Sequence, residues 1–403
     1  MGYVDNQRQN WFISAGEVSG DIIASGLVEA AHRFFGPDSI SFFGICGPKL
    51  ENAGVEKIID MHQLNVMGLG EILSHLPRIA AIEQEILESI EKRNPQVCIL
   101  VDFPGFHFRL AKRLRLRGHK VIQYVAPKVW AWGQGRVKRL RRDFDLVLGI
   151  LPFEAKFFRE HGVSFQYIGS PHLDRVENVK ELDGINQGSM SRELSFAILP
   201  GSRRSEVRRI APVLGKICEW VLLNASEKIR DHIRFRLPVA EGLSGEFIEE
   251  YLLADLDLMK ASVKSKVDYY RGQQSLSVMK SCSAAVVTSG TATLECGLLG
   301  TPMAVVYKMN PFSFLLAKLL VKVRWISLVN LSLSKSAVPE FIQSINVSEV
   351  GGYLLSLLDD ESDAYREQRK DLQALSSMYK ALSSELALEK IQGQMLEPAN
   401  EDG

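Results

Sequence analysis

Residues 283–302 read SAAVVTSGTATLECGLLGTP and predict a buried strand, a tight turn and a helix, in that order. The β-branched pair Val286 and Val287 suits the strand, and the leucines after the turn recur at helical spacing until Gly300. A helix that begins among Ser, Gly and Thr residues exposes backbone N–H groups and the positive end of its dipole, and phosphate binds well there. An ordinary helix capped by Ser or Thr is the alternative for this segment taken alone.

Two further features favour a phosphate ligand in this half of the chain. Glu295 lies one turn inside the predicted helix, where its carboxylate could accept hydrogen bonds from a nucleotide ribose, by analogy with dinucleotide folds. A second turn, Gly201-Ser202-Arg203, follows the strand predicted at residues 195–199. Because a guanidinium can hold phosphate in a bidentate way, the two turns together predict a diphosphate site.

The first half carries a candidate catalytic carboxylate. Residues 96–101 read as a strand that is buried on both faces, and it ends at Asp102. Ligands of α/β folds bind at the carboxyl ends of such strands. Asp102 is therefore a candidate general base that deprotonates a substrate hydroxyl, and a helix cap is the alternative. A glycine-rich turn at residues 16–21 follows the strand predicted at residues 11–15.

The chain alternates strands and helices in two halves. Its 403 residues exceed what one core usually organises, so two domains are expected. We predict an α/β fold with Rossmann-like domains at residues 1–173 and 194–361, joined by a polar linker at 174–193. A helix at residues 362–395 is expected to pack on the first domain or on a partner subunit.

Composition excludes several classes of protein. Lys plus Arg equals Asp plus Glu at 48 each, so the net charge is zero, and a nucleic-acid ligand is not expected. The five cysteines form no CxxC pair and mostly lie in apolar runs, which indicates reduced core residues of a cytoplasmic protein. The N-terminus lacks a signal-peptide pattern, and no uncharged run is long enough to span a membrane.

Three segments suggest contact with an amphiphilic ligand or a membrane. Apolar residues recur at helical spacing within 66–82, where glycines and a proline favour an acyl-binding flap, although core packing is the commoner explanation. The segment 311–333 is apolar with interspersed lysines, as in a helix on a bilayer surface or a core helix. Trp130 and Trp132, followed by arginines, could form a wall for a phosphorylated ligand or belong to a solvated helix face.

The ordered motifs together resemble those of the lipid-A-disaccharide synthase family. The resemblance extends from about residue 11 to about residue 345 and rests on SAGEVSGD (14–21), GICGP (44–48), DFPGF (102–106), YVAP (124–127) with VWAW (129–132), LPGSR (199–203) and SGTATLE (289–295). It implies a GT-B glycosyltransferase with two domains that face a cleft and a C-terminal helix that crosses back. The implied enzyme is inverting and metal-independent, and it joins UDP-2,3-diacylglucosamine to 2,3-diacylglucosamine 1-phosphate, with release of UDP.

The resemblance also assigns roles to residues of this sequence. It implies that the base is Asp102 or Glu17. The remaining assignments are the donor site, at Gly201, Ser202, Arg203, Ser289, Gly290, Thr291, Ala292, Thr293, Glu295, Asn330 and Gln343; the N-terminal glycine turn, at Gly16, Ser19, Gly20 and Asp21; and acyl or membrane contact, at Met67, Leu69, Ile72, Leu73, Leu76, Phe312, Leu316 and Leu320. Val329 stands where the family usually has a proline, which weakens the assignment of Asn330 and Gln343.

The resemblance implies acylated glucosamine substrates as partners and peripheral attachment to the inner membrane surface. Neither a cofactor nor a nucleic-acid partner is expected, and a homodimer is left open.

Two other function classes remain at this stage. Another UDP-N-acetylglucosamine enzyme of the same fold, an epimerase or a peptidoglycan-type transferase, would keep both turns without needing the apolar stripe. A non-catalytic lipid-binding protein would keep the apolar surfaces without needing Asp102.

Overall fold

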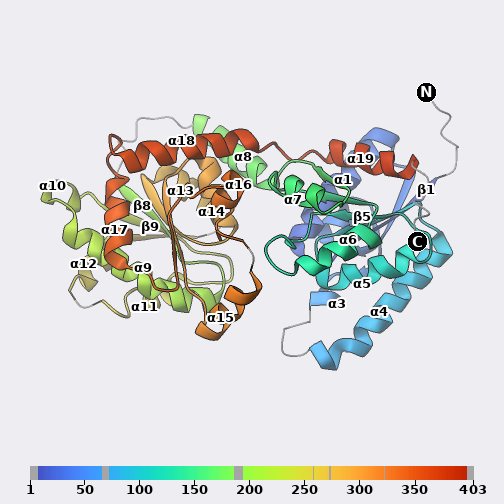
Figure 1. Cartoon of the computed structure of the whole chain (residues 1–403), viewed down its shortest axis with the longest axis horizontal. Helices are drawn as coiled ribbons and strands as arrows, with labels where there is room; N and C mark the ends of the chain where they lie inside the picture. Colours follow the sequence, from blue (N-terminus) through green and yellow to red (C-terminus); the bar gives the residue numbers. More distant parts are fainter. Residues whose placement is uncertain are drawn as a thin grey trace. The chain divides into compact units, whose positions relative to one another are not determined.

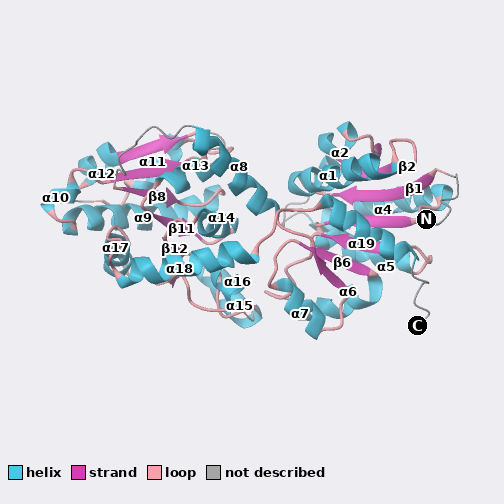
Figure 2. Ribbon diagram, turned by 90° about the horizontal axis from the view of Figure 1, so that it is seen from above, coloured by secondary structure: helices cyan, strands magenta, loops and turns pink. Residues whose placement is uncertain are grey.

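The chain forms two α/β units, drawn in Figure 1. This computed structural model describes residues 8–65, 72–185, 194–256, 258–271, 274–321 and 323–396. Unit 1 comprises Met1–Pro171 and Ala381–Gly403, and unit 2 comprises His172–Lys380. Each unit has its own parallel sheet with helices packed against it (Figure 2). The predicted α/β class with parallel sheets is therefore confirmed.

Unit 1 contains a seven-stranded sheet in the order β3-β2-β1-β4-β5-β6-β7. Its strands are β1 (Gln9–Ala15), β2 (Ile40–Cys46), β3 (Glu56–Asp60), β4 (Val97–Val101), β5 (Val121–Tyr124), β6 (Leu146–Gly149) and β7 (Phe165–Tyr167). Its helices are α1 (Val18–Phe35), α2 (Pro48–Asn52), α3 (His62–Asn65), α4 (Ile72–Arg93), α5 (Pro104–Arg115), the 3₁₀ turn η1 (Gln134–Arg136), α6 (Val137–Asp143), α7 (Glu154–Glu160) and α19 (Ser384–Leu396).

Side chains alternate across this sheet and build a core on each face. Phe12 and Leu100 point into one core, with residues of α4 and α5. Ile13 and Ile99 point into the other core, with residues of α1 and α19. Since both faces are covered, the central strands are apolar throughout, and all five residues of β4 are buried.

Unit 2 contains a six-stranded sheet in the order β10-β9-β8-β11-β12-β13. Its strands are β8 (Ser195–Leu199), β9 (Arg234–Pro238), β10 (Val267–Tyr270), β11 (Ala284–Thr288), β12 (Met303–Tyr307) and β13 (Glu340–Ile342). Its helices are α8 (Pro171–Ile185, which begins at the end of unit 1), α9 (Arg204–Asn224), α10 (Glu227–Arg230), α11 (Gly245–Leu252), α12 (Lys260–Lys266), α13 (Ser275–Ser281), α14 (Thr291–Leu299), α15 (Pro311–Leu320), α16 (Leu328–Leu333), α17 (Val347–Ser356) and α18 (Asp363–Met378).

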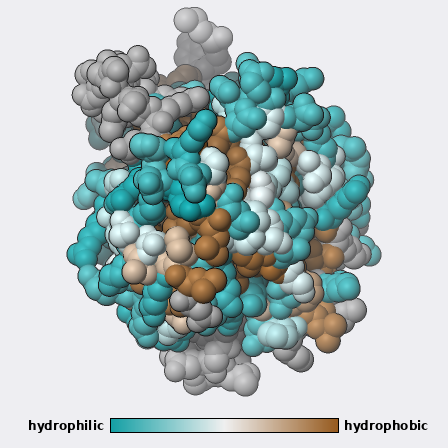
Figure 3. Space-filling view, turned by 90° about the vertical axis from the view of Figure 1, so that its left-hand side faces the viewer, coloured by the Kyte–Doolittle hydropathy of each residue, from teal (hydrophilic) through white to brown (hydrophobic). Residues whose placement is uncertain are grey.

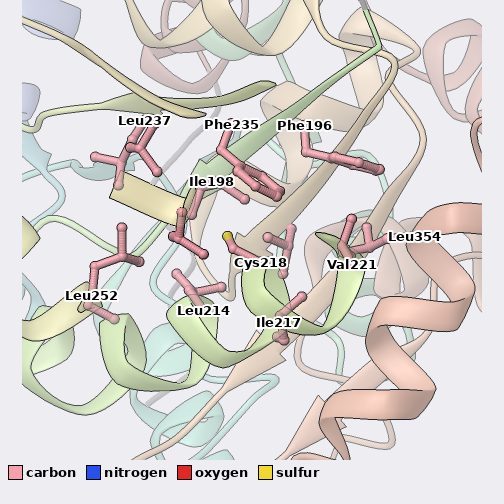
Figure 4. Packing of buried hydrophobic residues seen from close by; sticks show 14 of the residues in the cluster. Phe196, Ile198, Leu214, Ile217, Cys218, Val221, Phe235, Leu237, Leu252 and Leu354 are labelled. Atoms are coloured by element: carbon pink, nitrogen blue, oxygen red, sulfur yellow. The ribbon is translucent and has the colours of Figure 1, made fainter. Parts of the chain in front are cut away.

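One face of this second sheet packs on α9. Figure 4 shows Phe196 and Phe235 from β8 and β9 facing Leu214 and Cys218 of α9, with Leu354 of α17 closing one side. All five cysteines of the chain are buried and free of disulfide bonds. The strand, turn and helix predicted at residues 283–302 are confirmed as β11 and α14, and α14 ends where Gly300 adopts the left-handed conformation (φ 75°).

Both sheets reverse their strand order beside the first strand of the unit. In unit 1, β1 lies between β2 and β4; in unit 2, β8 lies between β9 and β11. The chain therefore leaves the two neighbouring strands in opposite directions, which opens a crevice at their carboxyl ends. The turns that the sequence singled out follow these particular strands.

Several sequence-based boundaries differ from the structure. The predicted linker 174–193 includes most of α8, and its residues 186–193 lie outside the described residues. The single helix predicted at 362–395 is two helices, α18 packed on α14 and α16 of unit 2 and α19 packed on α1 of unit 1. The strands β3 and β13 were not predicted, because they are short, partly exposed edge strands without a continuous apolar run.

The segment between α18 and α19 enters unit 1 against a glycine. Ser170 pairs with Ala381, and Ser383 N donates to Ile168 O (2.9 Å). Gly169 has φ 91°, and a Cβ at this position would lie 1.9 Å from the Ala381 carbonyl oxygen. A glycine at position 169 is therefore required for the returning segment to pack closely.

We expect Gly169→Ala to destabilise the docking of α19 by roughly 1–3 kcal/mol, since it adds both a steric clash and an unfavourable φ. Urea unfolding and limited proteolysis after residue 380 would measure the effect. Gly393→Ala, in α19 with no neighbour within 4 Å of the new Cβ, is the matched control and should be at least as stable as the parent chain. Equal stability of the two variants would contradict the role of Gly169.

Candidate functional site

Unit 2 holds a cavity of about 840 Å³ at the carboxyl ends of its strands, a size typical of ligand sites. The predicted residues Gly201, Ser202 and Arg203 line it together with Ser289, Gly290, Thr291 and Ala292. The remaining lining residues are Arg175, Leu199, Pro200, Glu206, Pro238, Val239, Ala240, Glu241, Gly242, Leu243, Ser244, Arg271, Ser275, Thr288 and Tyr307. Two turns that are far apart in sequence thus border one cavity, because β8 and β11 are neighbours in the sheet.

The turn at residues 201–203 already presents its N–H groups to an anionic oxygen. Ser202 N and Arg203 N each donate to Glu206 Oε2 at 3.3 Å. Gly201 has φ 102°, and a Cβ there would approach this same oxygen to 2.8 Å. The Arg203 side chain is 80% exposed, so its guanidinium can reach a ligand in the cavity. This turn has the donors that a phosphate group requires.

The turn at residues 289–292 borders the cavity, whereas the predicted residue Thr293 is buried outside the lining. Thr288 Oγ1 donates to Leu199 O (2.8 Å), which ties this turn to the preceding one. The hydroxyls of Ser289 and Thr293 donate to Ile326 O (3.1 Å) and Gly290 O (2.8 Å). Gly290 has no atom within 4 Å of a notional Cβ, so the start of α14 is open to a ligand.

Glu295 lies outside this lining. It is 5% exposed, and its Oε1 accepts hydrogen bonds from Arg175 Nη1 (2.6 Å) and lies 3.2 Å from His172 Nδ1. Arg175 does line the cavity, so Glu295 orients a cation toward it. The direct contact of Glu295 with ribose remains a prediction.

Asn330 and Gln343 also lie outside the lining and organise backbone. Asn330 Oδ1 accepts from Ala337 N (2.8 Å) and Val338 N (2.9 Å), while its Nδ2 donates to Glu340 Oε1 (2.9 Å). Glu340 in turn accepts from Ile326 N and Ser327 N. Gln343, at φ 66°, exchanges two hydrogen bonds of 3.2 Å with the backbone of Met309. Both side chains shape the loops after β12 and before β13.

Several residues that line the cavity were not predicted from the sequence. Arg175 comes from the helix that was predicted as linker, and Arg271 follows β10. Residues 239–244 directly follow β9. The segments that follow parallel strands all begin at the same edge of the sheet, and this rule points to these residues once the strands are known.

In unit 1 the pairing of β1 with β4 brings the predicted turns together. Gly16 follows β1 and Phe103 follows β4, and a Cβ on Gly16 would lie 2.5 Å from the Phe103 ring. Glu17 is exposed and precedes α1, while Asp102 is half-buried at the end of β4. The two carboxylates proposed from sequence therefore follow two strands, β1 and β4, that are neighbours in the sheet.

Asp102 has an unusual backbone and a perturbed carboxyl group. Asp102 and Phe103 both adopt left-handed conformations (φ 49° and 47°), which non-glycine residues rarely do. Burial raises the pKa of the Asp102 carboxyl, and a backbone hydrogen bond from Phe103 and the charge of Lys128 oppose this shift. A raised pKa makes the carboxylate a stronger base.

One residue of the N-terminal glycine turn, Asp21, has a structural role. Asp21 is buried and accepts hydrogen bonds from Gly47 N (2.9 Å), Lys49 N (2.9 Å) and Leu50 N (3.2 Å). It thereby caps α2. Ser19 is exposed and Gly20 is buried against Val101. Gly16 directly follows β1, and Gly20 packs between the ends of β1 and β4, against Ala15 and Val101.

The two tryptophans after β5 have different environments. Trp130 is buried, donates from Nε1 to Glu154 Oε1 (2.9 Å) and packs edge-on against Phe153. Trp132 is half-exposed under the guanidinium of Arg136, 4.6 Å from the ring centroid. Burial of Glu154 raises its pKa to about 8, so this side chain is a neutral acid that anchors the loop near pH 7.

Comparison with known proteins identifies the family. A sequence model described as lipid-A-disaccharide synthetase matches residues 11–391. The lipid-A-disaccharide synthase of Koribacter versatilis is 35% identical over 351 residues, with 86% of this chain and 87% of that protein covered. The corresponding protein of Geobacter sulfurreducens is 32% identical over 98% of both chains. This chain belongs to the lipid-A-disaccharide synthetase family.

Solved structures establish the fold class. The glycotransferase of kitacinnamycin aligns with a TM-score of 0.57 at 13% identity, covering 96% of this chain and 99% of that chain. The UDP-GlcNAc 2-epimerase from Neisseria meningitidis, bound to UDP-GlcNAc, aligns with a TM-score of 0.57 at 13% identity. The alignment covers 96% of this chain and 100% of that chain. The predicted GT-B fold and a UDP-sugar-dependent hexosyltransferase of the lipid-A-disaccharide synthetase family are confirmed.

The residues predicted to contact acyl chains or membrane are only partly described. Met67 and Leu69 lie outside the described residues, as do the side chains of Ile72, Leu73, Leu76, Phe312 and Leu316. Ile79 and Ile82, further along α4, are buried in the core. Leu320, on α15, is 53% exposed. Figure 3 shows one face of the molecule, on which hydrophobic side chains lie among hydrophilic ones.

The helix predicted at 311–333 is divided. It forms α15 and α16, because Ser327 caps α16 and Glu340 binds the backbone N–H groups of Ile326 and Ser327. Within the described residues, no helix has the length and apolar character needed to cross a membrane. The same part of the chain contains no group of three or more His, Cys, Asp or Glu side chains placed to hold a metal ion.

The neutral state of Glu154 has a measurable consequence. Its raised pKa stabilises the fold below pH 4.5, and this contribution is lost as the pH rises from 4.5 to about 8. We therefore expect the stability of Glu154→Gln relative to the parent chain to increase with pH in this window, by up to about 1.4 kcal/mol per pH unit. Urea unfolding between pH 5 and pH 9 would measure this, with the exposed Glu160→Gln as control. Parallel pH profiles for Glu154→Gln and the parent would refute a buried neutral acid.

Proposed function

We propose that this chain joins UDP-2,3-diacylglucosamine to 2,3-diacylglucosamine 1-phosphate, giving the β-1,6-linked disaccharide 1-phosphate and UDP. The observation that carries the proposal is the pair of anion-binding turns bordering one cavity in unit 2 of a lipid-A-disaccharide synthetase family member. UDP combines a diphosphate with a ribose and a base. The cavity offers backbone N–H groups, Arg203, Arg175 and Arg271 to such a ligand.

The reaction is a single displacement. The 6-hydroxyl oxygen of the acceptor attacks the anomeric carbon of the donor, the bond from that carbon to the diphosphate breaks, and the configuration inverts. Asp102 takes the proton of the attacking hydroxyl. UDP leaves with the bonding electron pair, and Arg203 together with the N–H groups at the starts of α9 and α14 stabilises its charge. These donors take the place of a metal ion, so no cofactor is needed.

Because the proposed substrates carry acyl chains, the reaction is expected to take place at a membrane surface. We infer that the chain attaches peripherally to the cytoplasmic side of the inner membrane. Leu315 and Leu320, exposed on α15 with Lys318 between them, would contact the lipid, and the lysine would pair with anionic head groups. The apolar residues predicted from sequence within 67–76 would bind the acyl chains of the substrates.

Incubation of the purified chain with both acylated sugars tests the function. We expect UDP and a disaccharide 1-phosphate in equal amounts, and neither product when one sugar is omitted. UDP-GlcNAc offered alone distinguishes the rival enzyme, because an epimerase would convert it to its 2-epimer. Absence of UDP release with authentic substrates in detergent micelles would overturn the proposal.

Single-turnover kinetics with saturating donor distinguish the two candidate bases. We expect Asp102→Asn to slow the chemical step by roughly 10²- to 10⁴-fold, because the amide cannot accept the proton. Glu17→Gln, its matched control at the start of α1, should slow this step by less than about tenfold. A near-normal rate for Asp102→Asn, combined with a large loss for Glu17→Gln, would move the role of base to Glu17.

A further inference from the structure

The backbone of Asp102 is held by buried polar side chains that the proposed reaction does not use. The Asp102 carbonyl oxygen accepts hydrogen bonds from His107 Nδ1 (2.7 Å) and from Gln123 Nε2 (3.3 Å). His107 Nε2 in turn lies 2.8 Å from Ser14 Oγ. His107, Ser14 and Gln123 are all buried, although side chains of these types usually face solvent.

The chemistry of the acceptor fixes the direction of every bond in this chain. A carbonyl oxygen has no proton, so His107 must donate from Nδ1. Burial lowers the pKa of His107 to about 4, and the ring is therefore neutral at pH 7 with its lone pair on Nε2. Ser14 Oγ consequently donates to Nε2. The bonds run from Ser14 on β1, through His107 on α5, to the carbonyl of Asp102 after β4.

The position of these bonds matters because the backbone of Asp102 is strained. Asp102 and Phe103 are consecutive left-handed residues, and neither is a glycine. The orientation of the Asp102 carbonyl defines the plane of the peptide bond between Asp102 and Phe103, and with it the direction in which the Asp102 side chain leaves the backbone. Gln123 Nε2 adds a second donor and also binds Val125 O (3.1 Å), at another left-handed residue.

We propose that Ser14 and His107 are positioning residues for the transfer reaction, which keep Asp102 in the left-handed conformation that aims its carboxylate at the acceptor hydroxyl. The neutral Nδ1–H form of His107 is the active form. This inference rests on the proposed role of Asp102 as base. His107 touches no substrate in this scheme and acts only through the backbone of Asp102.

Two amide replacements of His107 distinguish the contributions of its two ring nitrogens. The Asn amide nitrogen can occupy the place of Nδ1 and still donate to Asp102 O, whereas the Gln amide reaches the place of Nε2 and contacts Ser14 only. We expect His107→Gln to slow single-turnover transfer by about 100-fold without changing the KM for the UDP-sugar, since misplacing a catalytic group by about 1 Å has this effect. His107→Asn should restore most of that loss. Ser14→Ala, a milder variant, should give a smaller loss with the fold intact.

A double-mutant cycle tests the route of the effect. In the Asp102→Asn background, His107→Gln should cause no further loss of rate, because its action passes through Asp102. Equal losses for the Gln and Asn variants, a rate loss that follows thermal stability, or additive effects in the cycle would each overturn the proposal.

Crystal structures of the variants provide a readout that does not depend on activity. His107→Gln should show the peptide between Asp102 and Phe103 rotated out of the left-handed region, and His107→Asn should retain it. If the parent chain has no transferase activity but His107→Gln shows this rotation, the proposed function is rejected. The positioning of Asp102 by His107 then still stands. An unrotated peptide in an active parent would reject the positioning and leave the function standing.

Discussion

Both units depend on the same constraint, the adjacency of two parallel strands whose following segments diverge. Parallel strands bring all their carboxyl ends to one edge, and a reversal of strand order leaves an uncovered crevice at that edge. In unit 1 this adjacency joins β1 to β4 and so places Gly16 beside Phe103. In unit 2 it joins β8 to β11 and so places residues 201–203 beside residues 289–292. In each unit the fold thus brings together turns that are far apart in the sequence.

The turns of the two units differ in backbone geometry as much as in side chains. Unit 2 uses Gly201 and Gly290 to keep the turns open, and the carboxylate of Glu206 already accepts from the exposed N–H groups. Unit 1 instead places non-glycine residues in left-handed conformations at Asp102, Phe103 and Val125. Strain of this kind persists only where surrounding structure holds it, and it is concentrated at functional sites. The buried side chains of His107 and Gln123 provide that support.

Three carboxyl groups, two buried and one half-buried, mainly organise loops. Asp21 caps α2, Glu340 divides the segment after β12 into two helices, and Glu154 anchors the Trp130 loop as a neutral acid. Each such group satisfies backbone or indole donors that would otherwise be buried without partners. Asp21 thereby links the motif at residues 14–21 to the motif at 44–48, and Glu154 holds the motif at 129–132.

The sequence by itself determined the α/β class, the central strands, the turns that follow them and the family, because buried parallel strands are continuous apolar runs and helix starts require small or hydroxylated residues. It did not determine the edge strands β3 and β13, the helical character of residues 174–185, or the break between α18 and α19. Only the tertiary structure decided that Arg175 and not Glu295 lines the cavity, and that His107 supports Asp102. These outcomes depend on contacts between residues far apart in the chain, such as Ser14 with His107 and Arg175 with Glu295, which no local pattern encodes.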